Sequence, residues 1–340
     1  FFHCFGCGKG GDVFTFLMDI SGMSFMEALE HLAERVGLQM PKRKFQSADS
    51  RAQTERTAAA NLAAAEYFHR TLNAGEGTKG RDYLESRKLS PEIIRKFRLG
   101  YAPADSTGLL AFARQKGVSA DDLDLAGILL KSKYGGSPYG RFAGRVIFPI
   151  IDTAGRVLGF GGRILEGDGA KYVNSPETAI YHKSRILFGL YQAKDALKRS
   201  REAIVVEGYM DVISLHQAGI KNVIAASGTS FTVDQGRIIS RLARSVTLLF
   251  DGDSAGLSAA GRSADMLLST DLAITVSVLS GGHDPDSFVR ELGVEALREH
   301  LSKAMDIWEF KLLALSRGAA DPEDRVRLAG EVADSISLIL

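Results

Sequence analysis

Short apolar runs separated by helical patterns dominate residues 200–300. Three of these runs, 203–206, 245–250 and 273–279, are rich in β-branched residues. Such runs are typical of buried parallel strands, and the amphipathic segments between them predict covering helices. The pattern therefore predicts an α/β unit with a mostly parallel sheet over 199–300.

The pattern upstream of residue 199 predicts a mixed α+β unit. Residues 58–72 are alanine-rich with helical spacing, and short helical segments follow them. Two strand-like runs, 145–151 and 156–160, are joined by Asp-Thr-Ala-Gly, which has the composition of a hairpin turn. The glycines at 159, 161 and 162 predict either a place where the backbone approaches another group closely or a β-bulge.

The two ends of the chain complete the expected organisation. Apolar residues at helical spacing predict helices within 1–40, and the polar stretch 41–57 indicates a linker. We therefore expect an N-terminal piece over 1–40, a linker over 41–57, the mixed unit over 58–198, the parallel-sheet unit over 199–300 and the start of a helical unit over 301–340. The absence of an initial Met and the apolar last residues lead us to expect a chain cut at both ends.

Composition narrows the classes of function. The 340 residues are 45% hydrophobic and 24% charged, which is typical of a folded globular protein. No apolar run approaches the ~18 residues of a membrane span, so we expect no membrane partner. The two cysteines do not make a disulfide framework and indicate a reducing, cytoplasmic compartment. The net charge of +1 conceals a basic segment, because 141–201 holds 11 Lys and Arg against 5 Asp and Glu.

Carboxylates follow the end of each of the three predicted strands. They are Glu207 and Asp211, then Asp251 and Asp253, then Asp284 and Asp286. The carboxyl ends of parallel strands share one edge, where open α/β sheets place their sites. These acids would repel one another, and their oxygens are the ligands that Mg²⁺ prefers. The pattern predicts a metal site and phosphoryl-transfer chemistry. A helix N-cap would explain one such acid, but it is a weaker explanation for three successive motifs.

The same motifs resemble the toprim fold of bacterial primases, topoisomerases and some nucleases. They are Val206-Glu-Gly-Tyr-Met-Asp-Val212, Phe250-Asp-Gly-Asp-Ser-Ala-Gly256 and Asp284-Pro-Asp286. The basic segments upstream are similar to those of DnaG-type bacterial DNA primases. They are Arg145-Val-Ile-Phe-Pro-Ile, Gly159-Phe-Gly-Gly-Arg163, Lys171-Tyr-Val-Asn-Ser-Pro-Glu-Thr178 and Tyr181-His-Lys183. The resemblance covers essentially the whole chain.

The resemblance implies roles for individual residues. Glu207, Asp251, Asp253, Asp284 and Asp286 would bind several Mg²⁺ or Mn²⁺ ions, with Asp211 in support. Arg145, Arg163, Lys171 and Lys183 would contact nucleotide and template, together with Asn174 and Tyr172. Glu207, Asp251, Asp253 and Lys171 would be catalytic, and whether Glu207 is a ligand or a base stays open. The implied reaction is attack of a ribonucleotide 3′-OH on the α-phosphate of the next NTP, with release of pyrophosphate.

Cys4 and Cys7 have the spacing of half a zinc knuckle, and a structural zinc site needs four ligands. The resemblance implies that 1–40 is the end of a zinc ribbon whose other ligands precede this chain. Zinc is therefore expected in the intact protein, and two cysteines alone do not complete the site.

The resemblance also implies partners. They are single-stranded DNA template, NTPs and the RNA primer, with the replicative helicase bound through a C-terminal domain that this chain lacks. We expect a monomer. Two alternatives stay open, a toprim nuclease or topoisomerase relative and a non-catalytic toprim module that binds DNA. The complete set of acids argues against the second.

Overall fold

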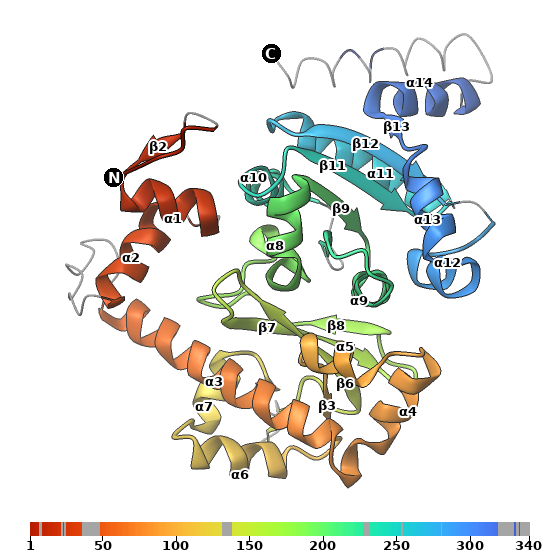
Figure 1. The fold of residues 1–340 in the computed structure, drawn as a ribbon. Helices are drawn as coiled ribbons and strands as arrows, with labels where there is room; N and C mark the ends of the chain where they lie inside the picture. The colour runs from red at the N-terminus through yellow and green to blue at the C-terminus, as the bar shows by residue number, and fades with distance from the viewer. Residues whose placement is uncertain are drawn as a thin grey trace.

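The computed structural model of the protein describes residues 1–6, 9–21, 23, 25–35, 48–130, 138–226, 231–252, 254–279 and 281–318, together with 330 and 333. Two sheets organise the described residues. Figure 1 shows them one above the other, with the N-terminal helices to one side.

The upper sheet has five strands in the order β10-β9-β11-β12-β13. Its strands are β9 (Glu202–Val206), β10 (Val223–Ala225), β11 (Ser245–Phe250), β12 (Ala273–Val278) and β13 (Met305–Asp306). The helices of this part are α9 (Tyr209–Gln217), α10 (Val233–Ser240), α11 (Ser254–Leu268), α12 (Pro285–Leu292), α13 (Val294–Leu301) and α14 (Ile307–Gly318). The first four strands are parallel, as the apolar runs predicted.

The edge strand β13 pairs antiparallel with β12 and was not predicted. It has only two residues, which is too short to show a strand pattern. The predicted helical tail is confirmed as far as α14, and most of 319–340 lies outside the described residues.

The lower sheet has four antiparallel strands in the order β3-β6-β7-β8. They are β3 (Gly100–Ala102), β6 (Arg145–Ile151), β7 (Val157–Ile164) and β8 (Tyr172–Asn174). The helices around this sheet are α3 (Ala48–Leu72), α4 (Thr78–Ser86), α5 (Pro91–Lys96), α6 (Thr107–Gln115) and α7 (Ala120–Leu125), with two 3₁₀ turns, η1 (Gly75–Gly77) and η2 (Lys183–Arg185). A short ribbon pairs β4 (Leu129–Leu130) with β5 (Tyr139–Gly140), and α8 (Leu190–Ser200) leads to the upper sheet. The predicted hairpin of β6 and β7 is confirmed.

Helix α3 begins at Ala48, within the stretch 41–57 that was predicted to be a linker. The polar residues of 48–57 lie mostly on the exposed face of the helix, where Arg51 and Glu55 form an i,i+4 pair of 3.1 Å. Arg56 reaches Asp122 of α7 at 2.5 Å. The linker predicted from polar composition is therefore wrong for residues 48–57. These ion pairs support a helix that faces solvent.

The close approach predicted at the glycines of β7 is confirmed. A Cβ on Gly159 would lie 2.5 Å from the ring of Tyr181, and a Cβ on Gly161 would lie 2.4 Å from the ring of Tyr209. Both rings therefore pack directly on the strand. Tyr209 is the first residue of α9, so this contact joins the lower sheet to the upper one.

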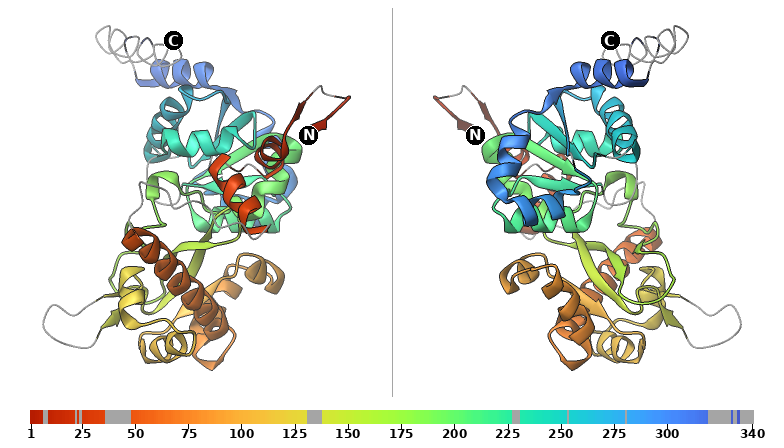
Figure 2. Two further views of the ribbon diagram at one scale, coloured as in Figure 1. Left: turned by 90° about the vertical axis from the view of Figure 1, so that its left-hand side faces the viewer. Right: turned by 90° about the vertical axis from the view of Figure 1, so that its right-hand side faces the viewer.

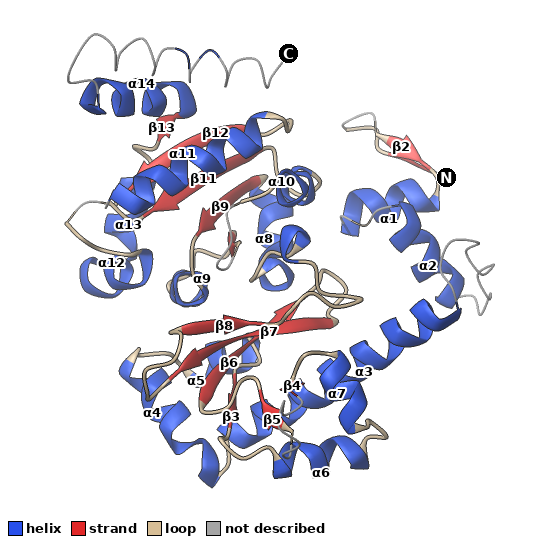
Figure 3. Cartoon of the chain, turned by 180° about the vertical axis from the view of Figure 1, so that it is seen from behind, coloured by secondary structure: helices blue, strands red, loops and turns tan. Residues whose placement is uncertain are grey.

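One hydrophobic core runs through both sheets. It includes Phe97 and Phe148 from the lower part and Tyr209 and Val212 from the upper part, with Phe188 between them. Tyr209 stacks on Phe148 with ring centroids 5.0 Å apart, and Phe188 meets Tyr209 edge-on at 4.7 Å. The core fixes the relative position of the two sheets, which Figure 3 shows from behind.

The N-terminal residues form a small separate unit. It comprises β1 (Phe2–His3), β2 (Gly10–Gly11), α1 (Val13–Ser21) and α2 (Phe25–Arg35), and both predicted helices are present. The hairpin of β1 and β2 projects away from the body of the molecule in both views of Figure 2. Lys198 of α8 donates a hydrogen bond to the carbonyl of Ile20 in α1.

Candidate active site at the acidic sheet edge

The parallel register of β9, β11 and β12 brings their carboxyl ends to one edge. Glu207 directly follows β9 and is exposed, and Asp251 directly follows β11 and is half-buried. Asp284 lies at the start of α12, after β12, and is exposed. Asp253 lies outside the described residues. The predicted edge therefore carries three of its acids on three adjacent strands.

Asp211 is buried at the first turn of α9. Its Oδ2 accepts from the backbone N–H of Gly208 at 2.9 Å, and its Oδ1 accepts from that of Asp286 at 3.3 Å. Burial and, to a smaller extent, the negative charges of Asp284 and Asp251 together raise the pKa of Asp211 to about 7. The repulsion shows that these acids are close enough to interact, and a bound cation would relieve it.

The carboxylate of Asp286 is fully engaged with protein groups. It lies 2.8 Å from Arg87 Nη1, accepts from Ser214 Oγ at 2.6 Å and lies 3.7 Å from Arg290. Asp286 is 2% exposed. This differs from the expectation of a metal ligand, because a buried carboxylate held by these partners is not presented to a ligand from solution. Its contacts fix the start of α12 instead.

The donor set at this edge consists of carboxylate oxygens, which suit a hard divalent cation. No group of three or more His, Cys, Asp or Glu residues lies close enough to hold a metal ion within the part of the chain that the structure describes. Asp253 is outside that part. The donor chemistry therefore fits Mg²⁺ or Mn²⁺.

Arg145 lies inside the lower sheet rather than on a binding surface. It is 7% exposed, and its Nη1 donates to the carbonyls of Ala170 at 2.9 Å and of Gly162 at 3.3 Å. Burial lowers its pKa. These bonds fasten β6 to the segment that leads into Lys171. In the structure, Arg145 makes contacts that hold the backbone just before Lys171, and not the contact with nucleotide that was predicted for it.

Arg163 lies in an aromatic cage. Its guanidinium carbon is 4.4 Å from the ring centre of Tyr83 and 5.9 Å from that of Tyr172, and its Nη1 donates to the Tyr83 hydroxyl. Burial raises the pKa of Tyr172. The charge of Arg163 lowers this pKa and the charge of Asp211 raises it, both by less than burial does. The ring of Tyr172 also lies 5.9 Å from that of Tyr209 in α9, so Tyr172 packs between the lower sheet and the first turn of α9.

The other predicted basic-side residues are Lys171, Asn174 and Lys183. Lys171 is exposed at the start of β8. Asn174 accepts from the hydroxyl of Tyr209 at 2.7 Å, which ties β8 to the first turn of α9. Lys183 is half-buried, and its backbone N–H donates to Glu177 at 2.9 Å. Only Lys171 among these three presents an unobstructed side chain.

Sequence reasoning missed Arg87, Tyr83 and Ser214. Arg87 follows α4 and pairs with Asp286 across the two sheets, and Tyr83 of α4 lies under Arg163. None of the three belongs to a spaced motif, and Arg87 and Asp286 are 199 positions apart. No local pattern in one sequence signals such a pair.

Cys4 is exposed and lies in the turn of the β1–β2 hairpin, where its N–H donates to the carbonyl of Lys9 at 2.7 Å. Cys7 lies outside the described residues. An exposed thiol in a hairpin turn, as at Cys4, suits a zinc knuckle.

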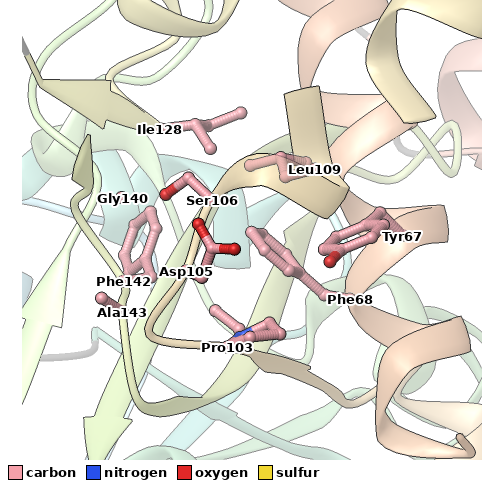
Figure 4. Close-up of a pocket in the computed structure, with 11 residues that line it drawn as sticks. Tyr67, Phe68, Pro103, Asp105, Ser106, Leu109, Ile128, Gly140, Phe142 and Ala143 are labelled. Carbon is pink, nitrogen blue, oxygen red and sulfur yellow. The ribbon is translucent and has the colours of Figure 1, made fainter. Parts of the chain in front are cut away.

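The cavity in Figure 4 is not a candidate site. Tyr67 and Phe68 of α3, Asp105, Ser106 and Phe142 are among its lining residues, and it holds about 10 Å³. That volume suits at most a single water molecule.

No described helix is both long enough and apolar enough to cross a membrane.

Three protein families match the chain in succession. Residues 1–48 match the CHC2 zinc finger, residues 67–194 match the N-terminal domain of the DNA primase catalytic core, and residues 204–289 match a toprim-like family. The three ranges follow, in order, the N-terminal unit, the part with the lower sheet and the part with the upper sheet.

Curated relatives named DNA primase align with nearly the whole chain. The protein of Halalkalibacterium halodurans is 37% identical over 340 residues, covering 99% of this chain and 57% of its own length. The Escherichia coli K12 protein is 38% identical over 339 residues, covering 97% of this chain and 58% of its own length. The chain thus spans little more than half the length of these relatives.

Solved structures share the fold. A DnaG primase catalytic domain bound to single-stranded DNA superposes with a TM-score of 0.75 at 35% identity, covering 85% of this chain and 94% of that one. The zinc-binding and RNA polymerase domains of the Aquifex aeolicus primase give a TM-score of 0.71 at 33% identity, covering 97% of this chain and 83% of that one. The α/β fold predicted from the sequence is confirmed.

Proposed function

The chain belongs to the family of DnaG-type bacterial DNA primases, and we propose that it joins ribonucleotides into short RNA primers on single-stranded DNA. The observation that carries the proposal is the meeting of acidic and basic groups at one boundary. Glu207, Asp251 and Asp284 follow three parallel strands, and from the lower sheet Tyr172 packs on Tyr209 of α9 and carries Arg163 over its ring.

The carboxylates would hold the divalent metal. Glu207, Asp251, Asp253 and Asp284 are the proposed ligands, with Asp211 behind them. Mg²⁺ or Mn²⁺, when bound, would neutralise charge on the triphosphate and lower the pKa of the attacking hydroxyl. Glu207, exposed at the edge, serves either as a ligand or as the acceptor of the hydroxyl proton.

The basic side would bind and orient the reacting phosphates. Lys171, exposed at the start of β8, is the residue we assign to the charge that builds up on the phosphates. Arg163 is held by Tyr83 and Tyr172, so little of its freedom remains to be lost when it meets a phosphate. Asn174 fixes the first turn of α9, next to Glu207. Lys183 supports the same side and contacts template.

The partners follow from the family. Single-stranded DNA is the template, NTPs are the substrates and an RNA primer is the product. Zinc would be held by Cys4, Cys7 and ligands that precede residue 1. The replicative helicase would bind through a C-terminal region outside this chain. We propose that the protein works as a monomer in the cytoplasm.

A single assay separates the candidate functions. The protein is incubated with a labelled single-stranded DNA, labelled NTPs and Mg²⁺ or Mn²⁺. Primase activity gives new chains that incorporate ribonucleotides and are destroyed by alkali. A shortened DNA label without such chains would instead identify a nuclease. Retardation of the DNA without either product would identify a binding module, and both of these results overturn the proposal.

A further inference from the structure

Tyr83 of α4 contacts two arginines at once. The guanidinium carbon of Arg163, in β7, is 4.4 Å from the centre of the Tyr83 ring, and that of Arg87 is 5.6 Å from it. Both distances are within the range in which the face of an aromatic ring attracts a cation. The Tyr83 hydroxyl also accepts a hydrogen bond from Arg163 Nη1. One half-buried side chain therefore joins a cation of the lower sheet to a cation at the end of α4.

The two arginines differ in what they bind. Arg87 Nη1 lies 2.8 Å from the carboxylate of Asp286, so this guanidinium is already paired. Within the part of the chain that the structure describes, Arg163 has no carboxylate partner, and its one hydrogen bond goes to Tyr83. Its Nε is buried and has no partner among the described residues. A guanidinium whose N–H groups are mostly unmatched by protein suits the binding of a phosphate.

One face of α4 carries Tyr83 together with two other contacts. Lys79, Tyr83 and Arg87 follow one another at four-residue intervals, so they share a face of the helix. Lys79 Nζ lies 2.7 Å from Glu166, in the turn after β7. The backbone N–H of Arg87 donates to the carbonyl of Tyr83 at 3.2 Å and closes the last turn. This face of α4 therefore contacts β7 and the turn after it at one end and α12 at the other.

Tyr172 shows that both arginines lie near the acids of the edge. Its ring centre is 5.9 Å from the guanidinium carbon of Arg163. Burial has the largest effect on the pKa of Tyr172 and raises it. The charges of Arg163 and Arg87 lower this pKa. The charges of Asp211 and Asp286 raise it. One hydroxyl thus lies within electrostatic reach of two cations and two carboxylates.

A packing role alone would not need the Tyr83 hydroxyl. The ring is among the half-buried side chains that pack against the core between the sheets, and a phenylalanine would fill the same space. The hydroxyl instead supplies the one protein hydrogen bond of Arg163, the arginine without a carboxylate.

We propose that Tyr83 is a positioning residue for nucleotidyl transfer, which directs the Arg163 guanidinium at the phosphates of the incoming nucleotide from a helix turn that Arg87 fixes to the acidic edge. Tyr83 acts through Arg163 and does not itself touch the nucleotide. The inference rests on the proposed function, because it takes the anion at Arg163 to be a nucleotide phosphate. Without Tyr83 the guanidinium would have to be ordered during the reaction, and a misplacement of about 1 Å can lower a rate by roughly 10²-fold.

A double-mutant cycle in kcat/KM for the NTP tests the proposal. RNA synthesis on single-stranded DNA is measured at saturating Mg²⁺ for wild type, Tyr83→Leu, Arg163→Gln and the double variant. In the wild-type background, Tyr83→Leu is expected to lower kcat/KM by roughly 10–100-fold. In the Arg163→Gln background the same substitution should change kcat/KM by no more than about 2-fold, because the group that Tyr83 positions is gone.

Tyr83→Phe separates the hydroxyl from the ring and keeps the test open if the leucine variant does not fold. It should keep the wild-type melting temperature and lower kcat/KM by roughly 2–10-fold, the contribution of one hydrogen bond. Tyr191 is the matched control, because it is half-buried, has Lys194 Nζ 4.6 Å from its ring centre and packs on a different hydrophobic cluster. Tyr191→Leu should lose as much stability as Tyr83→Leu and keep the wild-type kcat/KM.

Two kinetic results would overturn the proposal. They are an equal loss from Tyr83→Leu in both backgrounds, and a loss of the same size in Tyr191→Leu. Calorimetric titration of the four proteins of the cycle with ATP and Mg²⁺ gives a readout that does not need synthesis. If the wild type makes no RNA, the proposed function fails, and the positioning role stands only where Tyr83→Leu weakens ATP binding in the wild-type background and not in Arg163→Gln. ATP binding that does not depend on Tyr83 would then overturn both.

Discussion

At the scale of single residues, one arginine connects the lower part of the molecule to the acidic edge. Arg87 pairs with Asp286, the N–H of Asp286 donates to Asp211, and Asp211 in turn accepts from Gly208. Gly208 directly follows Glu207. The position of the exposed Glu207 carboxylate thus depends on a chain of contacts that begins at the end of α4.

Breaking this series of contacts should lower the stability of the fold. Arg87→Ala leaves the buried Asp286 carboxylate with poorer compensation, and we expect a loss of about 2–4 kcal/mol in the free energy of unfolding. A double-mutant cycle with Asp286→Ala should give a coupling energy of about 1–3 kcal/mol. Urea unfolding of the four proteins measures it. Additive effects would show that the pair does not hold the edge.

Lys171 should show the opposite behaviour. It is exposed, so Lys171→Ala is expected to leave the melting temperature unchanged while lowering the rate of RNA synthesis by roughly 10²–10³-fold, the cost of removing one charge-stabilising group. Lys303→Ala removes a comparably exposed lysine that pairs with Glu299, and it should be active. A fall in melting temperature that accounts for the lost activity would argue for a structural role.

The sequence predicted the positions of the acids better than it predicted which of them are exposed. Spacing after the apolar runs placed Glu207, Asp251 and Asp284 correctly at one edge, because parallel strands end together. The spacing could not distinguish the exposed acids from those that are buried and bonded to other protein groups. Asp286 is buried by contacts with Arg87 and Ser214, which come from distant segments.

At the scale of elements, strand β7 depends on glycine for its contact with α9. A Cβ on Gly161 would lie 2.4 Å from the ring of Tyr209, which itself stacks on Phe148. No rotation of the buried ring relieves this contact without disturbing the core between the sheets.

Alanine at Gly161 should therefore be destabilising by about 1–3 kcal/mol, the usual cost of overpacking. Gly261 of α11 provides the control, because a Cβ there meets nothing within 4 Å. Gly261→Ala should stabilise the helix by up to about 1 kcal/mol. Chemical denaturation of both variants checks the pair, and a neutral Gly161→Ala would contradict the packing described for β7.

Helix α9 also contains a buried histidine that makes stability depend on pH. His216 Nε2 lies 3.0 Å from the carbonyl of Val223, so that nitrogen carries the proton, and Nδ1 faces Lys96 at 3.4 Å. Burial, helped by the positive charge of Lys96 and opposed by the hydrogen bond to Val223, lowers the pKa of His216 to about 4.

The sign of the effect follows from this lowered pKa. Below pH 6.5 the unfolded chain takes up a proton that the folded chain does not bind until about pH 4. The stabilisation is therefore complete above pH 6.5 and is lost as the pH falls toward 4, with a total of about 3 kcal/mol. His216→Gln should remove this part of the pH dependence when urea unfolding is measured from pH 7.5 to 5. Parallel curves for variant and wild type would contradict it.

The elements themselves were largely predictable. The strands β9, β11 and β12 and the β6–β7 hairpin follow from apolar runs and turn composition. The start of α3 could not be predicted in this way, because most of its first ten residues are polar. They are held by ion pairs such as that of Arg56 with Asp122. The two-residue β13 exists only through its pairing with β12.

At the scale of the whole molecule, function depends on how the two sheets face each other. The shared core of Phe97, Phe148, Phe188 and Tyr209 sets that relation, and the Arg87–Asp286 pair closes it at the acidic edge. Neither could be derived from sequence spacing, since each joins segments that are far apart in the chain.

The most direct test of the central claim is RNA synthesis on single-stranded DNA by Asp251→Asn, with Asp271→Asn as the matched control. Asp251 follows β11 at the acidic edge, whereas Asp271 is exposed just before β12 begins, at the opposite end of the parallel strands. We expect Asp251→Asn to keep its melting temperature and its affinity for DNA but to lose at least roughly 10²-fold in synthesis, while Asp271→Asn matches wild type. Wild-type synthesis by Asp251→Asn, or an equal loss in Asp271→Asn, would contradict the assignment of the reaction to this edge.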